Sequence, residues 1–172
     1  MTLTDIFSGT YTANDVHFLL EPITLAWTTV EEKERLIQSG ERHYSDMLSE
    51  EPPPSSRHLD LFQAALSQGT DRLAREIVML AKGLMRDIDA RPIILLSFVR
   101  AGVPLGVLLH HALQEMGCPS AHYGISIVRD RGIDPVALSM IESRHGTNGI
   151  VFVDGWTGKG AIAAELKKAI NH

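Results

Sequence analysis

The sequence of 172 residues predicts an α/β fold, in which a parallel sheet within residues 91–172 is preceded by a helical N-terminal region at residues 1–90. In the second region, short apolar runs alternate with helix-forming segments, as is typical of βαβ units. Residues 150–153 are all β-branched or aromatic, which indicates a strand buried on both faces of a parallel sheet. A glycine-rich turn then leads into a strongly helix-forming segment at residues 161–169.

The N-terminal region shows helical patterns with clear interruptions. Residues 28–32 have the character of an N-cap followed by an acidic first turn, and the helix they begin is expected to end near residues 39–40. Three consecutive prolines at 52–54 break any regular helix or central strand. Apolar residues then recur at helical spacing at Leu59, Phe62, Ala65, Leu66, Leu73, Ile77, Leu80 and Leu84. We expect these helices to pack as a layer on the sheet, while direct substrate contacts from Ser8, Tyr11, His43 or Tyr44 stay open.

The α/β region is expected to contain three strands whose carboxyl ends meet at one edge. The predicted elements are a strand at 92–97, a loop at 98–106, a helix at 107–116, a strand at 122–128, a polar connection at 129–149 and a strand at 150–153. Because βαβ crossovers are right-handed and the strands parallel, the loops that follow the strands emerge on the same side of the sheet. Ligands bind at that edge in open α/β sheets.

Composition excludes several classes of protein. Apolar residues make up 44% and charged residues 22% of the chain, as in ordinary globular domains. The sequence has no apolar run long enough to cross a membrane and no signal-peptide pattern, so we expect a cytoplasmic protein without a membrane partner. The net charge of −5 gives no footprint for nucleic acid, and the single cysteine cannot form an internal disulfide. No Cys/His spacing matches a zinc site.

The glycine-rich turn after residues 150–153 is typical of a phosphate cradle. Gly155, Gly158 and Gly160 let the backbone turn sharply and approach a ligand closely, and free N–H groups at the start of the next helix favour an anion. Lys159 and the Thr157 hydroxyl would add donors. Asp154 is an acceptor placed where a sugar hydroxyl or a hydrated metal ion could bind.

Two further loops are expected at the same edge. The first strand is followed by Arg100, Ala101 and Gly102 just before a helix, where backbone amides and a guanidinium could face a second anion. The second strand is followed by Arg129 and Arg131 on a long connection, for which we expect mobility and closure over a substrate. The three loops together would suit a ligand with phosphates at two ends and a polyol between them.

Residues 97–106, 123–134 and 152–162 resemble a known family. The apolar strand, acid and Thr-Gly-Lys turn are similar to the loop of type I phosphoribosyltransferases that binds 5-phosphoribosyl 1-diphosphate (PRPP). More narrowly, the three segments resemble the phosphoribosyltransferase-like proteins associated with tellurium-resistance gene clusters, some of which carry an older label as a stress-induced cysteine protease. The resemblance implies a phosphoribosyltransferase-like, Rossmann-like core. Because the chain ends soon after the third loop, we expect this core to be truncated at its C-terminus or completed by another part.

The resemblance also implies roles for individual residues. Thr157, Gly158, Lys159 and Gly160 would hold the 5-phosphate of PRPP, Asp154 would bind ribose hydroxyls, and Arg100, Ala101 and Gly102 would contact the pyrophosphate. Arg129, Arg131 and Asp154 would be the catalytic residues, with Mg²⁺ bound mainly through the substrate pyrophosphate. The expected reaction transfers ribosyl 5-phosphate to an unidentified acceptor, by analogy a nitrogenous base, in a stress-related role and in a possible homo-oligomer. Gly155 departs from the family pattern, since it stands where a second acid is usual.

Other interpretations remain open on the sequence alone. The glycines could serve only to pack a helix on the sheet, or the domain could be a non-catalytic sensor of PRPP or of a nucleotide. Residues 158–163 also fit a dinucleotide-binding pattern, but the acid that should follow would lie beyond the chain. A cysteine protease would need Cys118 as nucleophile, yet this residue lies just past a predicted helix end, where we expect an inert or partly buried thiol.

Overall fold

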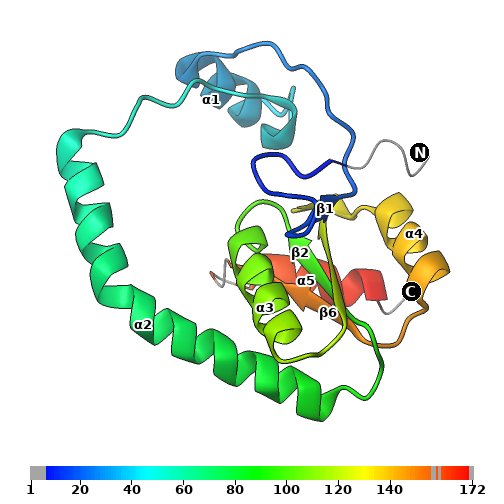
Figure 1. The fold of residues 1–172 in the computed structure, drawn as a ribbon. Helices are drawn as coiled ribbons and strands as arrows, with labels where there is room; N and C mark the ends of the chain where they lie inside the picture. Colours follow the sequence, from blue (N-terminus) through cyan, green and yellow to red (C-terminus); the bar gives the residue numbers. More distant parts are fainter. Residues whose placement is uncertain (1–6, 156–157, 159, 171–172) are drawn as a thin grey trace. The chain divides into compact units, whose positions relative to one another are not determined.

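The computed structural model describes residues 7–155, 158 and 160–170, and it confirms an α/β fold with a parallel four-stranded sheet. The strands of the sheet are β1 (His17–Phe18), β2 (Ile93–Phe98), β3 (Ser120–Ile125) and β6 (Ile150–Val153), in the order β1-β3-β2-β6 (Figure 1). The α-helices are α1 (Val30–Gln38), α2 (Ser56–Asp87), α3 (Val103–Glu115), α4 (Pro135–His145) and α5 (Ala161–Ile170). A 3-10 turn (Tyr44–Asp46) and a small hairpin, β4 (Ile127–Val128) and β5 (Gly132–Ile133), complete the list.

Strand β2 is the centre of the sheet. All six of its residues are buried, and it pairs in parallel with β3 along its whole length and with β6 from Ile94 to Ser97. A strand enclosed on both faces cannot carry alternating polar residues, which is why β2 reads as an almost continuous apolar run. Because β2 and β6 are parallel neighbours, the loops that follow them emerge together.

Alternate side chains of β2 pack into two separate hydrophobic cores, one on each face of the sheet. On one face, Ile93 and Leu95 pack with Leu109 and Leu113 of α3 and with Ile77 and Ala81 of α2. On the other face, Ile94, Leu96 and Phe98 pack with Ala137 and Ile141 of α4, and α5 adds partly buried apolar residues. This two-fold alternation follows from the pleat of the strand. The sheet is therefore covered by α3 on one side and by α4 and α5 on the other.

The chain divides into two compact units by its internal packing. One consists of the described residues up to Leu20 together with those from Arg72 onward, and the other is Glu21–Asp71. The division falls elsewhere than the expected boundary between residues 90 and 91. The reason is that β1 pairs with β3, through His17 with Tyr123 and Phe18 with Gly124, and that the second half of α2 packs under the sheet.

The predicted first helix is confirmed within the second unit. Thr29 caps α1, since its Oγ1 accepts a hydrogen bond from the Glu32 amide at 3.2 Å, and Ser39 closes the helix by donating its amide to Arg35 O at 2.9 Å. The prolines at 52–54 precede α2, which begins at Ser56, so they interrupt the helical region as expected.

The predicted polar connection at residues 129–149 is wrong. Its first part turns within the β4–β5 hairpin, and its second part is the helix α4. Asp134 caps α4, because its Oδ1 accepts from the Val136 amide at 2.9 Å and from the Ala137 amide at 3.2 Å, and Pro135 occupies the first turn. The Asp-Pro pair was the helix-start signal in the sequence. In addition, α3 begins at Val103 rather than 107, and β3 covers Ser120–Ile125 rather than 122–128.

Helix α2 offers a stabilising substitution. A Cβ added at Gly83 would meet no atom within 4 Å, and the backbone there is ordinary helix. Gly83→Ala should therefore raise the free energy of unfolding by about 0.5–1 kcal/mol, because alanine restricts the unfolded chain and favours the helix. Urea denaturation followed by circular dichroism measures this change. A less stable variant would show that the helix is not regular at this position.

Among the residues that the structure describes, no helix is both long enough and apolar enough to cross a membrane.

Candidate functional site

Two of the three predicted loops meet at the carboxyl edge of the sheet. The turn after β2 touches the turn after β6 so closely that a Cβ on Gly102 would lie 2.2 Å from the Val153 carbonyl oxygen. In the same way, a Cβ on Gly155 would lie 2.2 Å from the carbonyl oxygen of Ala101. Both glycines are thus required by direct backbone packing between the loops.

The backbone amides at the start of α3 are already bonded within the protein. The Gly102 amide donates to Phe98 O at 2.9 Å and the Val103 amide donates to Arg100 O at 3.2 Å. The turn therefore closes on itself and does not present these two N–H groups to an anion. The Arg100 side chain is exposed beside it, and Asp154 at the end of β6 is partly buried.

The third loop differs from the expected mobile cover. Arg129 and Arg131 are exposed at the turn of the β4–β5 hairpin, where the Arg131 amide donates to Val128 O at 3.1 Å. The hairpin lies against α5, and Ile133 is part of the core on that face. Both arginines therefore stand on a short paired ribbon, and the expected long connection is replaced by regular structure.

The remaining predicted residues are only partly described. Thr157 and Lys159 lie outside the described residues, while Gly158 and Gly160 are exposed, with φ of +77° at Gly160. The structure thus brings Ala101, Gly102 and Gly155 together. The assignment of a ligand to this edge stays a prediction, as does Mg²⁺, and the described residues contain no group of three or more His, Cys, Asp or Glu side chains that could hold a metal ion.

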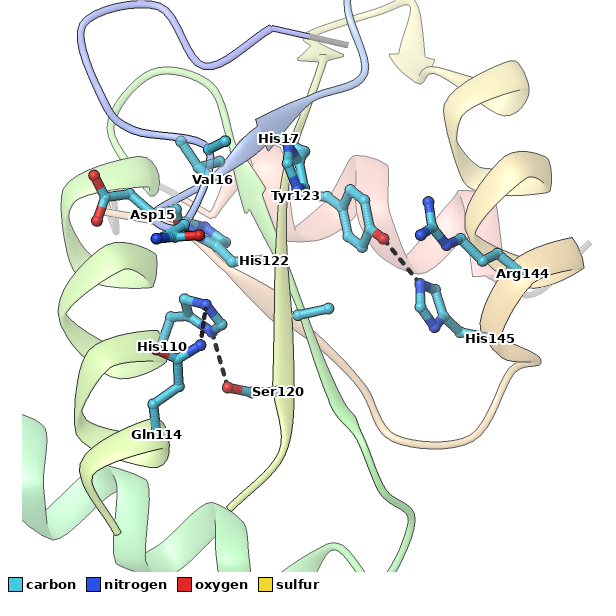
Figure 2. A pocket seen from close by; sticks show the side chains of 13 residues that line it. Asp15, Val16, His17, His110, Gln114, Ser120, His122, Tyr123, Arg144 and His145 are labelled. Atoms are coloured by element: carbon cyan, nitrogen blue, oxygen red, sulfur yellow. Dashed lines mark hydrogen bonds between the residues drawn. The ribbon is translucent and has the colours of Figure 1, made fainter. Parts of the chain in front are cut away.

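A cavity of about 260 Å³ opens elsewhere, at the outer edge of β3 (Figure 2). We name it the histidine pocket. Its lining comes from the segment before β1 and from β1 itself (Ala13, Asn14, Asp15, Val16, His17), from α3 (His110, Gln114), from β3 (Ser120, Ala121, His122, Tyr123) and from the end of α4 (Arg144, His145). No sequence motif marks these residues, because they come from four separate segments, the first of which is distant in sequence from the other three. Sequence reasoning missed this pocket.

Side chains on the α3 side of the pocket form a hydrogen-bonded chain. Gln114 Nε2 lies 3.0 Å from His110 Nε2, and His110 Nδ1 lies 2.8 Å from Ser120 Oγ. If the Gln114 amide donates, His110 carries its proton on Nδ1 and donates to Ser120. Burial lowers the pKa of His110 below its usual range, with a smaller contribution from His111. The imidazole is therefore neutral at physiological pH.

A second pair of hydrogen-bonded side chains lines the α4 side of the histidine pocket. The Tyr123 hydroxyl lies 3.0 Å from His145 Nε2 and can donate to it. Burial lowers the pKa of His145 and raises that of Tyr123, so both groups are neutral near pH 7. Figure 2 shows this pair across β3 from His110 and Gln114, with Arg144 beside it. On its α3 and α4 sides the pocket thus presents neutral polar groups and one guanidinium, and the Asp15 carboxylate lies on the segment before β1.

His122 forms a buried polar link behind the pocket. Its Nδ1 donates to the Asp15 backbone carbonyl at 2.7 Å, which leaves Nε2 to accept from the Ser97 hydroxyl at 2.7 Å. Burial lowers the pKa of His122 to about 4. The arrangement resembles a serine activated by a histidine, but Ser97 is fully buried and Gly106 of α3 packs directly over it. These hydrogen bonds join β2, β3 and the segment just before β1, and Ser97 is not accessible as a nucleophile.

Cys118 is the only cysteine of the chain and is 4% exposed. It packs among apolar residues of the core shared with Leu109 and Leu113, as the sequence led us to expect. Within the described part of the chain, its sulfur has one polar contact, 3.8 Å from Pro119 O. A catalytic thiolate needs a neighbouring base or cationic surroundings and access to substrate. In this conformation the thiol has neither.

Comparisons with known proteins identify the chain's relatives. The family model described as "Tellurite-like stress resistance cysteine protease StiP" matches residues 9–172. A protein named "Cysteine protease StiP" from Acinetobacter baylyi (strain ATCC 33305 / BD413 / ADP1) is 57% identical over 166 residues, which cover 96% of this chain and 43% of that protein. The chain thus spans less than half the length of this curated relative. No solved structure matches the chain.

These findings correct the functional prediction. The chain is not assigned to the phosphoribosyltransferases, and the predicted transferase class and PRPP-dependent reaction are wrong, because the family and the relative are both named as cysteine proteases. The alternative of a PRPP sensor gains no support either. Two glycines that the prediction assigned to anion-binding loops, Gly102 and Gly155, pack these loops against each other instead. The expected connection with stress resistance is supported by the description of the family. The chain belongs to the StiP family of tellurite-like stress resistance cysteine proteases.

Proposed function

We propose that this chain is part of a cysteine-dependent peptidase that acts in stress resistance. The observation that carries the proposal is the 57% identity, over almost the whole chain, to a protein named as a cysteine protease. The histidine pocket supports it, because a polar cavity at the edge of a parallel sheet can accept an extended backbone. The activity belongs to the whole protein, of which the chain matches less than half in that relative.

Within this proposal, we assign Cys118 a structural role. Its sulfur is enclosed by the same core that holds α3 against β2, and in the described part of the chain its polar contact is with the Pro119 carbonyl and not with a histidine. Exposing it would require the core under the sheet to open. The proposal therefore places peptide hydrolysis at a thiol other than Cys118.

Replacing Cys118 tests this assignment in the full-length protein. Cys118→Ser and Cys118→Ala should retain peptidase activity within about twofold, because neither removes an accessible nucleophile, although burying a hydroxyl should lower the stability of the serine variant by about 1–3 kcal/mol. Hydrolysis of a fluorogenic peptide library, with and without iodoacetamide, measures this. Loss of activity in both stable variants would make Cys118 the nucleophile. Activity that is insensitive to thiol alkylation, or no hydrolysis at all, would overturn the cysteine-peptidase proposal itself.

Two further expectations, on the subtype of the fold and on the location in the cell, belong with this proposal. We infer that the sheet is of the Rossmann-like subtype found in phosphoribosyltransferases, as a matter of fold alone, which is supported by its parallel strands and its strand order. We also infer a cytoplasmic location, which is supported by the presence of one cysteine in 172 residues. An experimental structure and cell fractionation test these two points.

A further inference from the structure

The edge of β3 that faces the histidine pocket is only half covered. Strand β3 pairs with β2 along all six residues, from Ser120 to Ile125, but β1 pairs only with Tyr123 and Gly124. Before His17 the chain turns away, since the Asp15 and Val16 amides both donate back to Thr12 O. Within the described chain, the first half of β3 therefore has no strand beside it on this edge, and the histidine pocket occupies that place.

Two hydrogen bonds show toward which neighbouring strand the backbone N–H and C=O groups of β3 point. Leu19 donates its amide to Gly124 O, so the backbone groups of Gly124 point toward β1. Ile93 donates to Pro119 O, so Pro119 points the other way, toward β2. Because this direction alternates along a strand, the backbone N–H and C=O of Ser120 face the pocket, as does the N–H of His122. These are the groups that an added strand would bind.

The charges of the pocket favour an acidic ligand. The Asp15 carboxylate is already bound by the Thr12 amide and hydroxyl, both at 2.8 Å, and by His111 Nε2 at 2.7 Å. Arg144 is exposed at the pocket wall and has no acidic partner among the described residues. Burial lowers the pKa of His110, His122 and His145 and raises that of Tyr123, so these four groups are neutral donors or acceptors. The guanidinium thus provides the one charge on this wall that is open to a carboxylate.

We propose that the histidine pocket binds an acidic peptide segment in extended conformation, which adds a strand to the free edge of β3 and places a carboxylate on Arg144. Side chains of an extended peptide alternate between its two faces. One set would meet His110, Gln114 and Ser120 on the α3 side, and the other would meet Arg144 and His145 on the α4 side. The choice of a peptide rests on the proposed peptidase function, but binding does not require cleavage.

Fluorescence anisotropy with the full-length protein tests the proposal. The probe is a labelled short peptide of alternating threonine and glutamate, and the matched peptide of threonine and lysine should bind at least tenfold more weakly. Ser120→Pro removes the pocket-facing N–H and should weaken binding of the acidic probe by roughly tenfold, whereas Ser120→Ala removes only the hydroxyl and should change it less. Proline is tolerated at the first residue of a strand, so β3 should remain paired with β2.

Reversing the charge at Arg144 distinguishes a loss of peptide binding from a loss of folded structure, because the two probes should respond in opposite directions. Arg144→Glu should weaken the acidic probe by at least tenfold and strengthen the lysine probe, and an exposed position allows this change without unfolding. Equal affinity of both probes for wild type and Arg144→Glu would overturn the proposal, as would equal effects of Ser120→Pro and Ser120→Ala. Peptidase activity is measured in parallel. Binding without hydrolysis would sink the proposed function alone, and hydrolysis accompanied by equal affinity of both probes for wild type and Arg144→Glu would sink the docking site alone.

Discussion

Gly102→Ala is expected to lower the free energy of unfolding by about 3 kcal/mol, at the upper end of the usual cost of overpacking. The new Cβ would lie 2.2 Å from the Val153 carbonyl oxygen and 3.0 Å from both the amide nitrogen and the carbonyl oxygen of Phe98. All three atoms belong to the backbone of paired strands, so no flexible side chain can move aside. The φ of Gly102 is −73°, which alanine adopts freely, and the cost is therefore steric alone.

Gly83→Ala is the matched control for this prediction. The chemical change is identical, but the added methyl group enters open space on α2 and should stabilise the protein. Urea denaturation of wild type and both variants, followed by circular dichroism, gives the two differences on one scale. If Gly102→Ala proves as stable as wild type, the turns after β2 and β6 do not touch as the structure shows.

Elements that are buried on both faces could be predicted from the sequence. Strands β2 and β6 read as apolar runs, because all the side chains of β2 except that of Ser97 lie in one of two cores and those of β6 pack at least partly against the same cores. The start of α1 was also readable, since Thr29 provides a local cap whose effect does not depend on distant contacts. These signals are local in sequence or follow from full burial.

Other elements depend on contacts between distant segments. Strand β1 has two residues and exists because His17 and Phe18 lie beside β3, more than a hundred residues later in the chain. Helix α4 buries only Ala137 and Ile141, so its apolar stripe is too sparse to stand out from a polar connection. The histidine pocket likewise joins residues from four segments that share no motif. The local pattern of a single sequence does not indicate which distant segments come into contact.

Two of the glycines on which the functional prediction rested have another physical explanation. A glycine-rich turn between a strand and a helix is required both by anion binding and by close backbone packing, and the sequence does not distinguish the two. Here the contacts of Gly102 with Val153 and of Gly155 with Ala101 account for these two glycines. The family assignment came from similarity over the whole chain instead of from one turn.

Acidification should weaken the fold through His122. In the unfolded chain this imidazole has a pKa of 6.5, whereas in the folded protein burial lowers the pKa to about 4. As the pH falls, the unfolded state therefore binds a proton first, so the stability supplied by neutral His122 is complete above pH 6.5 and is lost as the pH falls toward 4. Protonation would also place a hydrogen on Nε2, which now accepts from Ser97. Linkage gives a loss of about 2 kcal/mol between pH 7.5 and pH 4.5 from this group.

Comparison with His122→Asn isolates this contribution. Several carboxylates with lowered pKa values, such as that of Asp15, also weaken the fold in acid, but they remain in the variant. The asparagine protein should be less stable than wild type at pH 7.5, because the link between Ser97 and the Asp15 carbonyl is altered, yet its stability should fall by about 2 kcal/mol less on acidification. Urea denaturation at the two pH values measures both differences, and NMR titration of the imidazole should show His122 neutral at pH 5.5. Parallel pH profiles for the two proteins would mean that His122 is solvated and that its hydrogen bonds to Ser97 of β2 and to the Asp15 carbonyl do not stabilise the fold.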